Sequence, residues 1–179
     1  VISKGVELTV NASPVRGLSI NGSATFLSSK FDDFAGAQCY PGQADASCAA
    51  TGSFNAAGKR TPTAPKFASS IQAMYEFQNA GSIHPFIEGN WYHRTTINYL
   101  VNQAPGASVP TIDLIGASAG VRLDNGMRLS IFCKNCTNEY NPNFIGLDAG
   151  DAISNIATYQ QQFGFDSVRT IGATVQFRF

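Results

Sequence analysis

The chain has 179 residues, with 12 basic and 12 acidic side chains and a formal net charge of zero. One ordinary domain fits this length, and the balanced charge gives no electrostatic signal for a nucleic-acid partner. Only 13% of the residues are charged, fewer than the surface of a water-exposed globule normally carries. There is no run of eighteen or more apolar residues, which excludes a transmembrane helix.

Seven segments are expected to be β-strands, because apolar and polar residues alternate along each of them. Clusters of Gly, Pro, Asn, Asp and Ser separate the segments, as expected of turns and loops. The expected strands cover about residues 6–12, 18–26, 66–78, 83–95, 111–123, 128–137 and 169–179.

The lengths of the connections predict how these strands are arranged. Short turns, among them Asn125-Gly126, alternate with long loops at about residues 30–65, 96–110 and 138–168. Strands joined in this way form an antiparallel meander, with the tight turns at one end and the long loops at the other. Short periplasmic turns and long extracellular loops are typical of an outer-membrane β-barrel.

The last segment continues its alternation to the end of the chain. One face carries the apolar residues Ile171, Ala173, Val175, Phe177 and Phe179. About ten alternating residues cross a bilayer at the tilt of a transmembrane barrel, and aromatic residues mark its interfaces. An inner strand of a soluble sandwich or barrel would show the same alternation.

The count of seven strands indicates that the barrel is not finished. Bacterial single-chain barrels have an even number of strands, and an open edge in lipid would leave backbone groups without hydrogen bonds. Either one strand is missing from the count or the chain is the C-terminal part of a larger barrel. The start Val-Ile-Ser-Lys, without an initiator Met or signal peptide, favours a piece of a longer protein.

Three stretches resemble the TonB-dependent outer-membrane receptors. Gly58-Lys-Arg-Thr-Pro-Thr-Ala-Pro-Lys66 resembles the G-x-R-x-P-x-A-P-x segment that leads into a descending strand. Asn135-Cys-Thr-Asn-Glu-Tyr140 is similar to the family's N-L-T-D-x-x-Y element, with Cys136 for Leu, Asn138 for Asp and the Tyr one position early. The terminal Val175-Gln-Phe-Arg-Phe179 resembles the aromatic-ended strand that the barrel assembly machinery recognises.

This resemblance implies a 22-stranded barrel with an N-terminal plug, of which residues 1–179 are the C-terminal part, without the plug and the N-terminal strands. It implies the outer membrane of a Gram-negative bacterium, and import of a ligand such as an iron-siderophore complex, cobalamin or a carbohydrate. The implied partners are membrane lipid, the TonB complex through a TonB box in the missing N-terminal part, and the assembly machinery at Val175, Phe177 and Phe179.

The cysteines give one expected disulfide. Cys39 and Cys48 lie nine residues apart in a loop expected outside the cell, where a disulfide would order the loop. Cys133 and Cys136 form Cys-Lys-Asn-Cys on a predicted strand, where positions i and i+3 face opposite ways. Unless the strand has already ended there, a bridge is disfavoured, and we expect this second pair to remain unbridged, as small apolar side chains.

The charged residues expected to face the lumen are Glu88, Arg94, Arg122 and Arg128. There they would contact the plug, line the ligand path or form an ion pair within the wall. His84 and His93 are expected on opposite faces of their strand, without a catalytic constellation. No cofactor or metal site is predicted, since the pairs Asp32-Asp33 and Asp148 with Asp151 match no calcium loop.

The leading hypothesis is a receptor and transporter, not an enzyme. The alternatives are a small, complete eight-stranded outer-membrane barrel that acts as an anchor or adhesin, and a soluble lipocalin-like ligand-binding barrel. An outer-membrane protease or acyltransferase is disfavoured because no nucleophile and base occur together.

Overall fold

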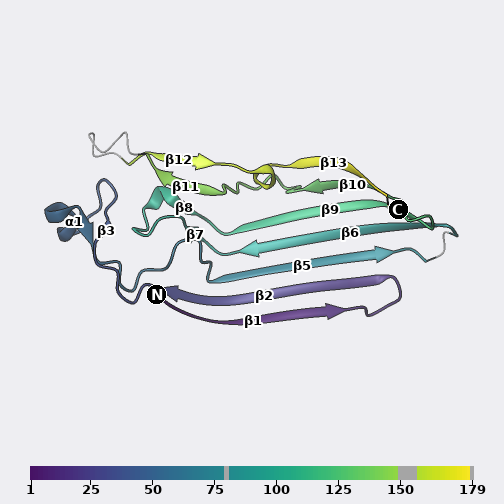
Figure 1. The fold of residues 1–179 in the computed structure, drawn as a ribbon, viewed down its shortest axis with the longest axis horizontal. Helices are drawn as coiled ribbons and strands as arrows, with labels where there is room; N and C mark the ends of the chain where they lie inside the picture. Colours follow the sequence, from purple (N-terminus) through teal and green to yellow (C-terminus); the bar gives the residue numbers. More distant parts are fainter. Residues whose placement is uncertain (79–80, 149–156, 178–179) are drawn as a thin grey trace.

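The structure, a computed structural model, describes residues 1–78, 81–148 and 157–177. Its main feature is one antiparallel sheet of seven strands whose spatial order follows the chain, β1-β2-β5-β6-β9-β10-β13 (Figure 1). The strands are β1 Ile2–Ala12, β2 Leu18–Lys30, β5 Phe67–Glu76, β6 Ile83–Arg94, β9 Ile112–Leu123, β10 Arg128–Lys134 and β13 Thr170–Gln176. The predicted all-β meander of seven strands is confirmed.

The turns lie at one end of the sheet and the long loops at the other (Figure 1). Gly17 has a φ of 87° at the turn into β2, and Gly126 has a φ of 83° between β9 and β10, a conformation that glycine adopts without strain. Asn125 supports the second turn, since its Oδ1 accepts a hydrogen bond from the Met127 amide. In the turn expected between β5 and β6, residues 79–80 lie outside the described residues.

The strand register sorts the side chains of the sheet into two unlike faces. On what we call the apolar face, large hydrophobic side chains are exposed, up to 65% for Ile131 and 75% for Ile171. Other exposed members of this face are Val6, Leu8, Phe26, Ile71, Ile87, Ile115 and Val175. The opposite, polar face carries mainly hydroxyl, amide and charged side chains. The exposed hydrophobic side chains favour an apolar environment on the apolar face, whereas the polar face can meet water.

The long loops fold into a loop cap, which comprises the described residues of 31–65, 96–110, 135–148 and 157–168. The three predicted long loops are present, and each of them contains a short hairpin that the sequence did not indicate. The hairpins are β3 Ala37–Gln38 with β4 Ser53–Phe54, β7 Ile97–Asn98 with β8 Ser108–Val109, and β11 Phe144–Leu147 with β12 Tyr159–Gln162. The cap also holds helix α1 Ala46–Thr51 and the 3-10 turns η1 Pro105–Ala107 and η3 Phe165–Ser167.

Most of the buried hydrophobic core lies in or beneath this cap. One cluster contains Ile97, Ala104, Ala107, Val109, Ile112 and Ile145, and a second contains Ala37, Phe54 and Ala56. Tyr92, Ile112 and Leu114, which pack in the first cluster, belong to the polar face of β6 and β9. The cap therefore covers the loop end of the polar face. No helix within the described ranges is long and apolar enough to cross a membrane.

Candidate functional site: the polar face and the loop cap

The centre of the polar face carries an ion pair that crosses two strands. Arg128 at the start of β10 reaches over β9 to Glu88 in the middle of β6, with 3.5 Å between Nη2 and Oε2. The Arg128 guanidinium lies 4.1 Å above the centre of the Phe86 ring, and Phe86 is buried beneath it. Ser118 and Gln72 also donate hydrogen bonds to the Glu88 carboxylate. Glu88 thus joins β5, β6, β9 and β10 across this face.

A second ion pair lies nearer the turns. Arg122 of β9 reaches across β6 to Glu76 of β5, with Nη2 to Oε1 at 2.6 Å and Nε to Oε2 at 3.2 Å. Two parallel hydrogen bonds of this kind fix the orientation of the guanidinium. Glu76 was not singled out from the sequence, because only the register of three strands shows that it lies within reach of Arg122.

Arg94 lies at the loop end of the same face, beneath the cap. It is 6% exposed, and its Nη2 lies 3.3 Å from the Asn141 Oδ1. Within the described part of the chain, its Nη1 has no hydrogen-bond partner. The neighbouring Tyr99 donates a hydrogen bond to the Pro142 carbonyl, and burial raises the pKa of Tyr99. The structure thus places a buried cation where the polar face meets the cap.

All four residues predicted to face a lumen, Glu88, Arg94, Arg122 and Arg128, lie on the polar face. The alternation along each strand was enough to assign them to this face. Whether this face lines a lumen remains a prediction. Val175, from the predicted assembly signal, is exposed on the apolar face, Phe177 is 60% exposed, and Phe179 lies outside the described residues.

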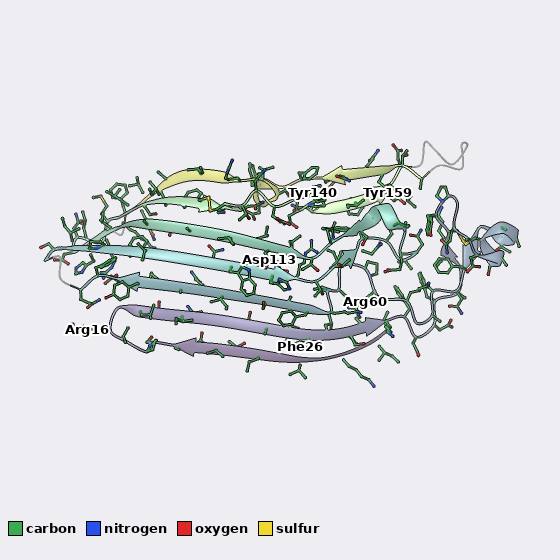
Figure 2. The ribbon with its side chains drawn as sticks, turned by 180° about the vertical axis from the view of Figure 1, so that it is seen from behind. Arg16, Phe26, Arg60, Asp113, Tyr140 and Tyr159 are labelled. Carbon is green, nitrogen blue, oxygen red and sulfur yellow. A yellow bond between two sulfur atoms is a disulfide. The ribbon has the colours of Figure 1, made fainter. Side chains whose placement is uncertain are left out.

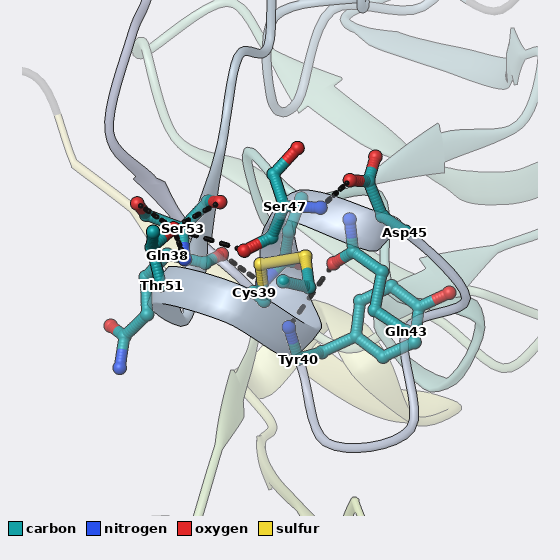
Figure 3. The surroundings of a disulfide bond; sticks show 10 residues. Gln38, Cys39, Tyr40, Gln43, Asp45, Ser47, Thr51 and Ser53 are labelled. Atoms are coloured by element: carbon teal, nitrogen blue, oxygen red, sulfur yellow. Dashed lines mark hydrogen bonds between the residues drawn. A yellow bond between two sulfur atoms is a disulfide. The ribbon is translucent and has the colours of Figure 1, made fainter.

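Cys39 and Cys48 are joined by a disulfide in the structure (Figure 3). The disulfide lies beside α1 and β3, at the outer end of the cap (Figure 1). Their Cα atoms are 5.8 Å apart, within the usual range. Asp45 caps the N-terminus of helix α1, since its carboxylate accepts a hydrogen bond from the Ser47 amide at 2.9 Å. The hydrogen bonds from Ser47 lower the pKa of Asp45. The disulfide thus holds α1 against the hairpin of β3 and β4.

The expectation that Cys133 and Cys136 remain unbridged is wrong in this structure, which joins them by a disulfide. Strand β10 ends at Lys134, and Asn135 has a φ of 45°. The chain therefore turns between the two cysteines and brings their Cα atoms to 5.6 Å. The argument from opposite faces holds only for a continuous strand, and this strand is three residues shorter than predicted.

The Asn135 stretch forms a tight turn where the chain leaves β10. The Asn135 side chain is buried, donates to the Glu139 carbonyl and accepts from the Glu139 amide. Asn138, with a φ of 55°, accepts a hydrogen bond from the Arg169 amide just before β13. These contacts explain why Asn occurs at both 135 and 138, since its side chain bonds to nearby backbone groups and it tolerates a left-handed backbone.

The Gly58–Lys66 stretch is held by contacts of its own. Arg60 pairs with Lys30 in an isolated β-bridge, and its Nη2 donates to the Ala64 carbonyl at 2.8 Å. The Thr61 hydroxyl donates to the hydroxyl of the buried Ser29. Together these contacts guide the chain from the cap back into β5.

The two histidines lie on opposite faces of β6, as predicted. His93, on the apolar face, and the Trp91 indole both hydrogen-bond to Asp113 Oδ1, at 2.9 and 2.8 Å. Phe67 lies beside His93, and Phe26 beside Phe67, with ring centres 5.8 and 4.6 Å apart. Aromatic and polar groups thus gather at the loop end of the apolar face, where Figure 2 labels Phe26 and Asp113.

No group of three or more His, Cys, Asp or Glu side chains in residues 1–78, 81–148 and 157–177 is placed to hold a metal ion. Asp148 belongs to these ranges, whereas Asp151 of the same predicted pair does not.

Comparison with known proteins shows which solved structures share this fold. The sequence matches no family profile and no curated protein. The structure resembles the siderophore receptor PiuA from Acinetobacter baumannii, with a TM-score of 0.64 and 16% identity over 98% of this chain. It also resembles BauA, the ferric preacinetobactin receptor from the same species, with a TM-score of 0.58 and 15% identity over 97% of this chain.

The chain therefore has the fold of part of a siderophore-receptor barrel, and the resemblance indicated by its motifs is confirmed at the level of the fold. Both solved proteins are receptors. This chain spans 21% of the length of each of them.

Proposed function

We propose that the chain is the C-terminal part of the barrel of a TonB-dependent outer-membrane receptor that imports a ferric siderophore or a similarly scarce ligand. The observation that carries this proposal is the sheet itself, with one exposed apolar face, one polar face and a loop cap folded over the polar side. The likeness to PiuA and BauA supports the same assignment.

The direction in which the cap folds supports a lipid contact for the apolar face. A soluble lipocalin-like barrel would turn its apolar face inward, and its loops would close over that face. Here the buried residues beneath the cap include Arg94 and Ile112 of the polar face, while Ile87 and Ile131 of the apolar face are exposed. The polar face is then the lumen wall, and the apolar face meets the hydrocarbon.

The free edges of the sheet support a larger barrel. Within the described residues, β1 pairs only with β2, and β13 pairs only with β10. In lipid such edges leave backbone groups unsatisfied, at several kcal/mol for each group. Further strands of the full-length protein would pair with both edges, and a complete eight-stranded barrel would need a closure that this sheet does not have.

The proposed roles divide by position. The loop cap contributes to ligand capture outside the cell, and the polar face, with Glu88, Arg94, Arg122 and Arg128, lines the ligand path or contacts a plug. The end of β13, with Val175, Phe177 and Phe179, is recognised by the barrel assembly machinery. TonB acts through the N-terminal part of the full-length protein.

Uptake of iron tests this proposal. The gene for the full-length protein would be deleted in its natural host, and iron-limited cells would be given radioactive iron on catecholate, hydroxamate and carboxylate siderophores. We expect uptake of at least one complex to fall in the deletion strain and to return when the gene is restored. In a strain that carries the gene but lacks TonB, uptake of that complex should stay low. Uptake that is unchanged for every complex would contradict import of siderophore iron.

A further inference from the structure

A basic groove lies at the loop end of the apolar face, beside strands β1 and β2. It has a volume of about 650 Å³, and it is lined by both charged and apolar side chains. The cations are Lys4, Lys30, Arg60 and Lys66, and the other side chains on the groove include Val6, Phe26 and Ser28. The register places three of them, Lys4, Lys30 and Arg60, on the apolar face, which carries few other charges.

The register explains why the cations come together. Lys4 lies opposite Ser28, and Ile2 lies opposite Lys30, so Lys4 and Lys30 are diagonal neighbours on the apolar face. Lys30 pairs in turn with Arg60 across the isolated bridge. Lys66 lies across β2 from β1, where its carbonyl accepts a hydrogen bond from the Leu27 amide. It is in register with the polar face and lines the groove from the start of β5.

No acidic side chain within the described ranges forms an ion pair with any of these four cations. Asp32 lines an adjoining groove together with Lys4 and Lys30, but it makes no ion pair there. Lys4, Lys30 and Lys66 are exposed, and Arg60 is held in place by its hydrogen bond to the Ala64 carbonyl. The positive charges that line one groove repel one another, and an anion bound between them would relieve this repulsion.

We propose that this groove binds the phosphate of a membrane lipid, whose acyl chain lies along Val6 and Phe26. The proposal rests on the proposed function, because it requires the apolar face to meet lipid. Phe26 in the groove lies beside Phe67, which in turn lies beside His93, so the groove adjoins the aromatic groups at the loop end of this face. Amphipathic rings of this kind gather at the depth of the lipid head groups. Cations at that depth match the charge of a phosphate head group, and the apolar side chains match the lipid tail.

Phosphatidic acid, which carries a terminal phosphate on two acyl chains, is the probe. The full-length protein would be purified in a neutral detergent and titrated with this lipid, and native mass spectrometry would count the bound molecules. Phosphatidylcholine with the same acyl chains is the control lipid, and inorganic phosphate is the control for the anion alone. The test variant is the double substitution Lys4→Gln with Lys30→Gln, and the matched control is Lys59→Gln with Lys134→Gln, since neither residue lines the groove.

We expect the wild-type protein to bind phosphatidic acid more tightly than phosphatidylcholine, and less tightly as salt is added. The test variant should bind it roughly thirtyfold more weakly, at about fivefold per lysine near a membrane surface. The control variant should bind like the wild type. Inorganic phosphate should not compete at equal concentration, because it lacks the chain that contacts Val6 and Phe26.

Three results would overturn the proposal. The first is equal affinity for the two lipids or for the two double variants. The second is competition by inorganic phosphate as strong as by the lipid, which would indicate a site for a free anion. The third is a dimer that the wild type and the control variant form and the Lys4 and Lys30 variant does not. This result would indicate that the groove binds a second copy of the chain and not a lipid. If the proposed function itself is wrong, the result differs from all three, because the full-length protein would then be folded and monodisperse without detergent.

Discussion

Arginine substituted for Ile87 tests which face of the sheet meets lipid. Ile87 lies near the centre of β6, between Tyr75 of β5 and Ala119 of β9, and it is 52% exposed on the apolar face. Asn90, three residues further on, is exposed on the polar face of the same strand. Asn90→Arg is therefore a control with the same introduced charge and nearly the same depth.

The expected size of the effect follows from the position of Ile87 in the strand. The 12 residues of β6, at about 3.3 Å per residue and a tilt of about 40°, cross roughly 30 Å, the thickness of the hydrocarbon core. Ile87 lies between one and two residues from the strand centre, or about 4 Å from the midplane at the same rise and tilt. Arginine at that depth destabilises a barrel by about 2–4 kcal/mol.

Equilibrium unfolding of the full-length protein in phospholipid vesicles, followed by tryptophan fluorescence, measures both variants. We expect Ile87→Arg to lower the free energy of unfolding by about 2–4 kcal/mol, and Asn90→Arg to change it by less than about 1 kcal/mol. An equal loss in the two variants, or a larger loss for Asn90→Arg, would refute the assignment of the apolar face to lipid.

Three further predictions concern the loop cap and the turns. Ile145→Ala, at a side chain 1% exposed, should destabilise the cap by about 2–5 kcal/mol and speed amide exchange in residues 97–109, while exchange in the sheet is unchanged. Cys39→Ser should remove about 2–3 kcal/mol of order from the closed loop, seen as faster proteolysis between residues 39 and 48; equal cleavage of both proteins would contradict this. The hydrogen bond from His84 lowers the pKa of Asp124, so the carboxylate stabilises the folded turn above its ordinary pKa of 3.8 and loses this effect as the pH falls through the lowered value. The unfolding free energies of wild type and Asp124→Asn should therefore differ at pH 5 and converge at lower pH, and a difference that grows with acid would refute the linkage.

The sequence was sufficient to predict the seven strands and their two faces, because a period of two depends only on the order of residues. It also assigned Glu88, Arg94, Arg122 and Arg128 to one face for the same reason. Their partners could not be predicted, since Glu76 meets Arg122 only through the register of three strands. Phe86 lies beneath Arg128 because β6 and β10 flank the same strand.

The loop cap was less accessible to sequence reasoning. Its hairpins contain strands of two to four residues, too short to show a period. Their stability comes from the cluster around Val109, Ile112 and Ile145, which joins loops far apart in the chain. The bridge between Cys133 and Cys136 was missed because it depends on where β10 ends, and strand ends are the least certain part of a sequence prediction.

The central claim, that this sheet is part of an outer-membrane barrel wall, is tested most directly on the full-length protein in its natural membrane. The outer-membrane fraction would be extracted with detergent, and unheated and heated samples would be compared by electrophoresis. We predict a protein that stays in the outer-membrane fraction, needs detergent to remain dispersed, and changes mobility on heating. A protein that is monodisperse without detergent would contradict the claim, and the side chains of the apolar face would then have to line the inside of a soluble barrel.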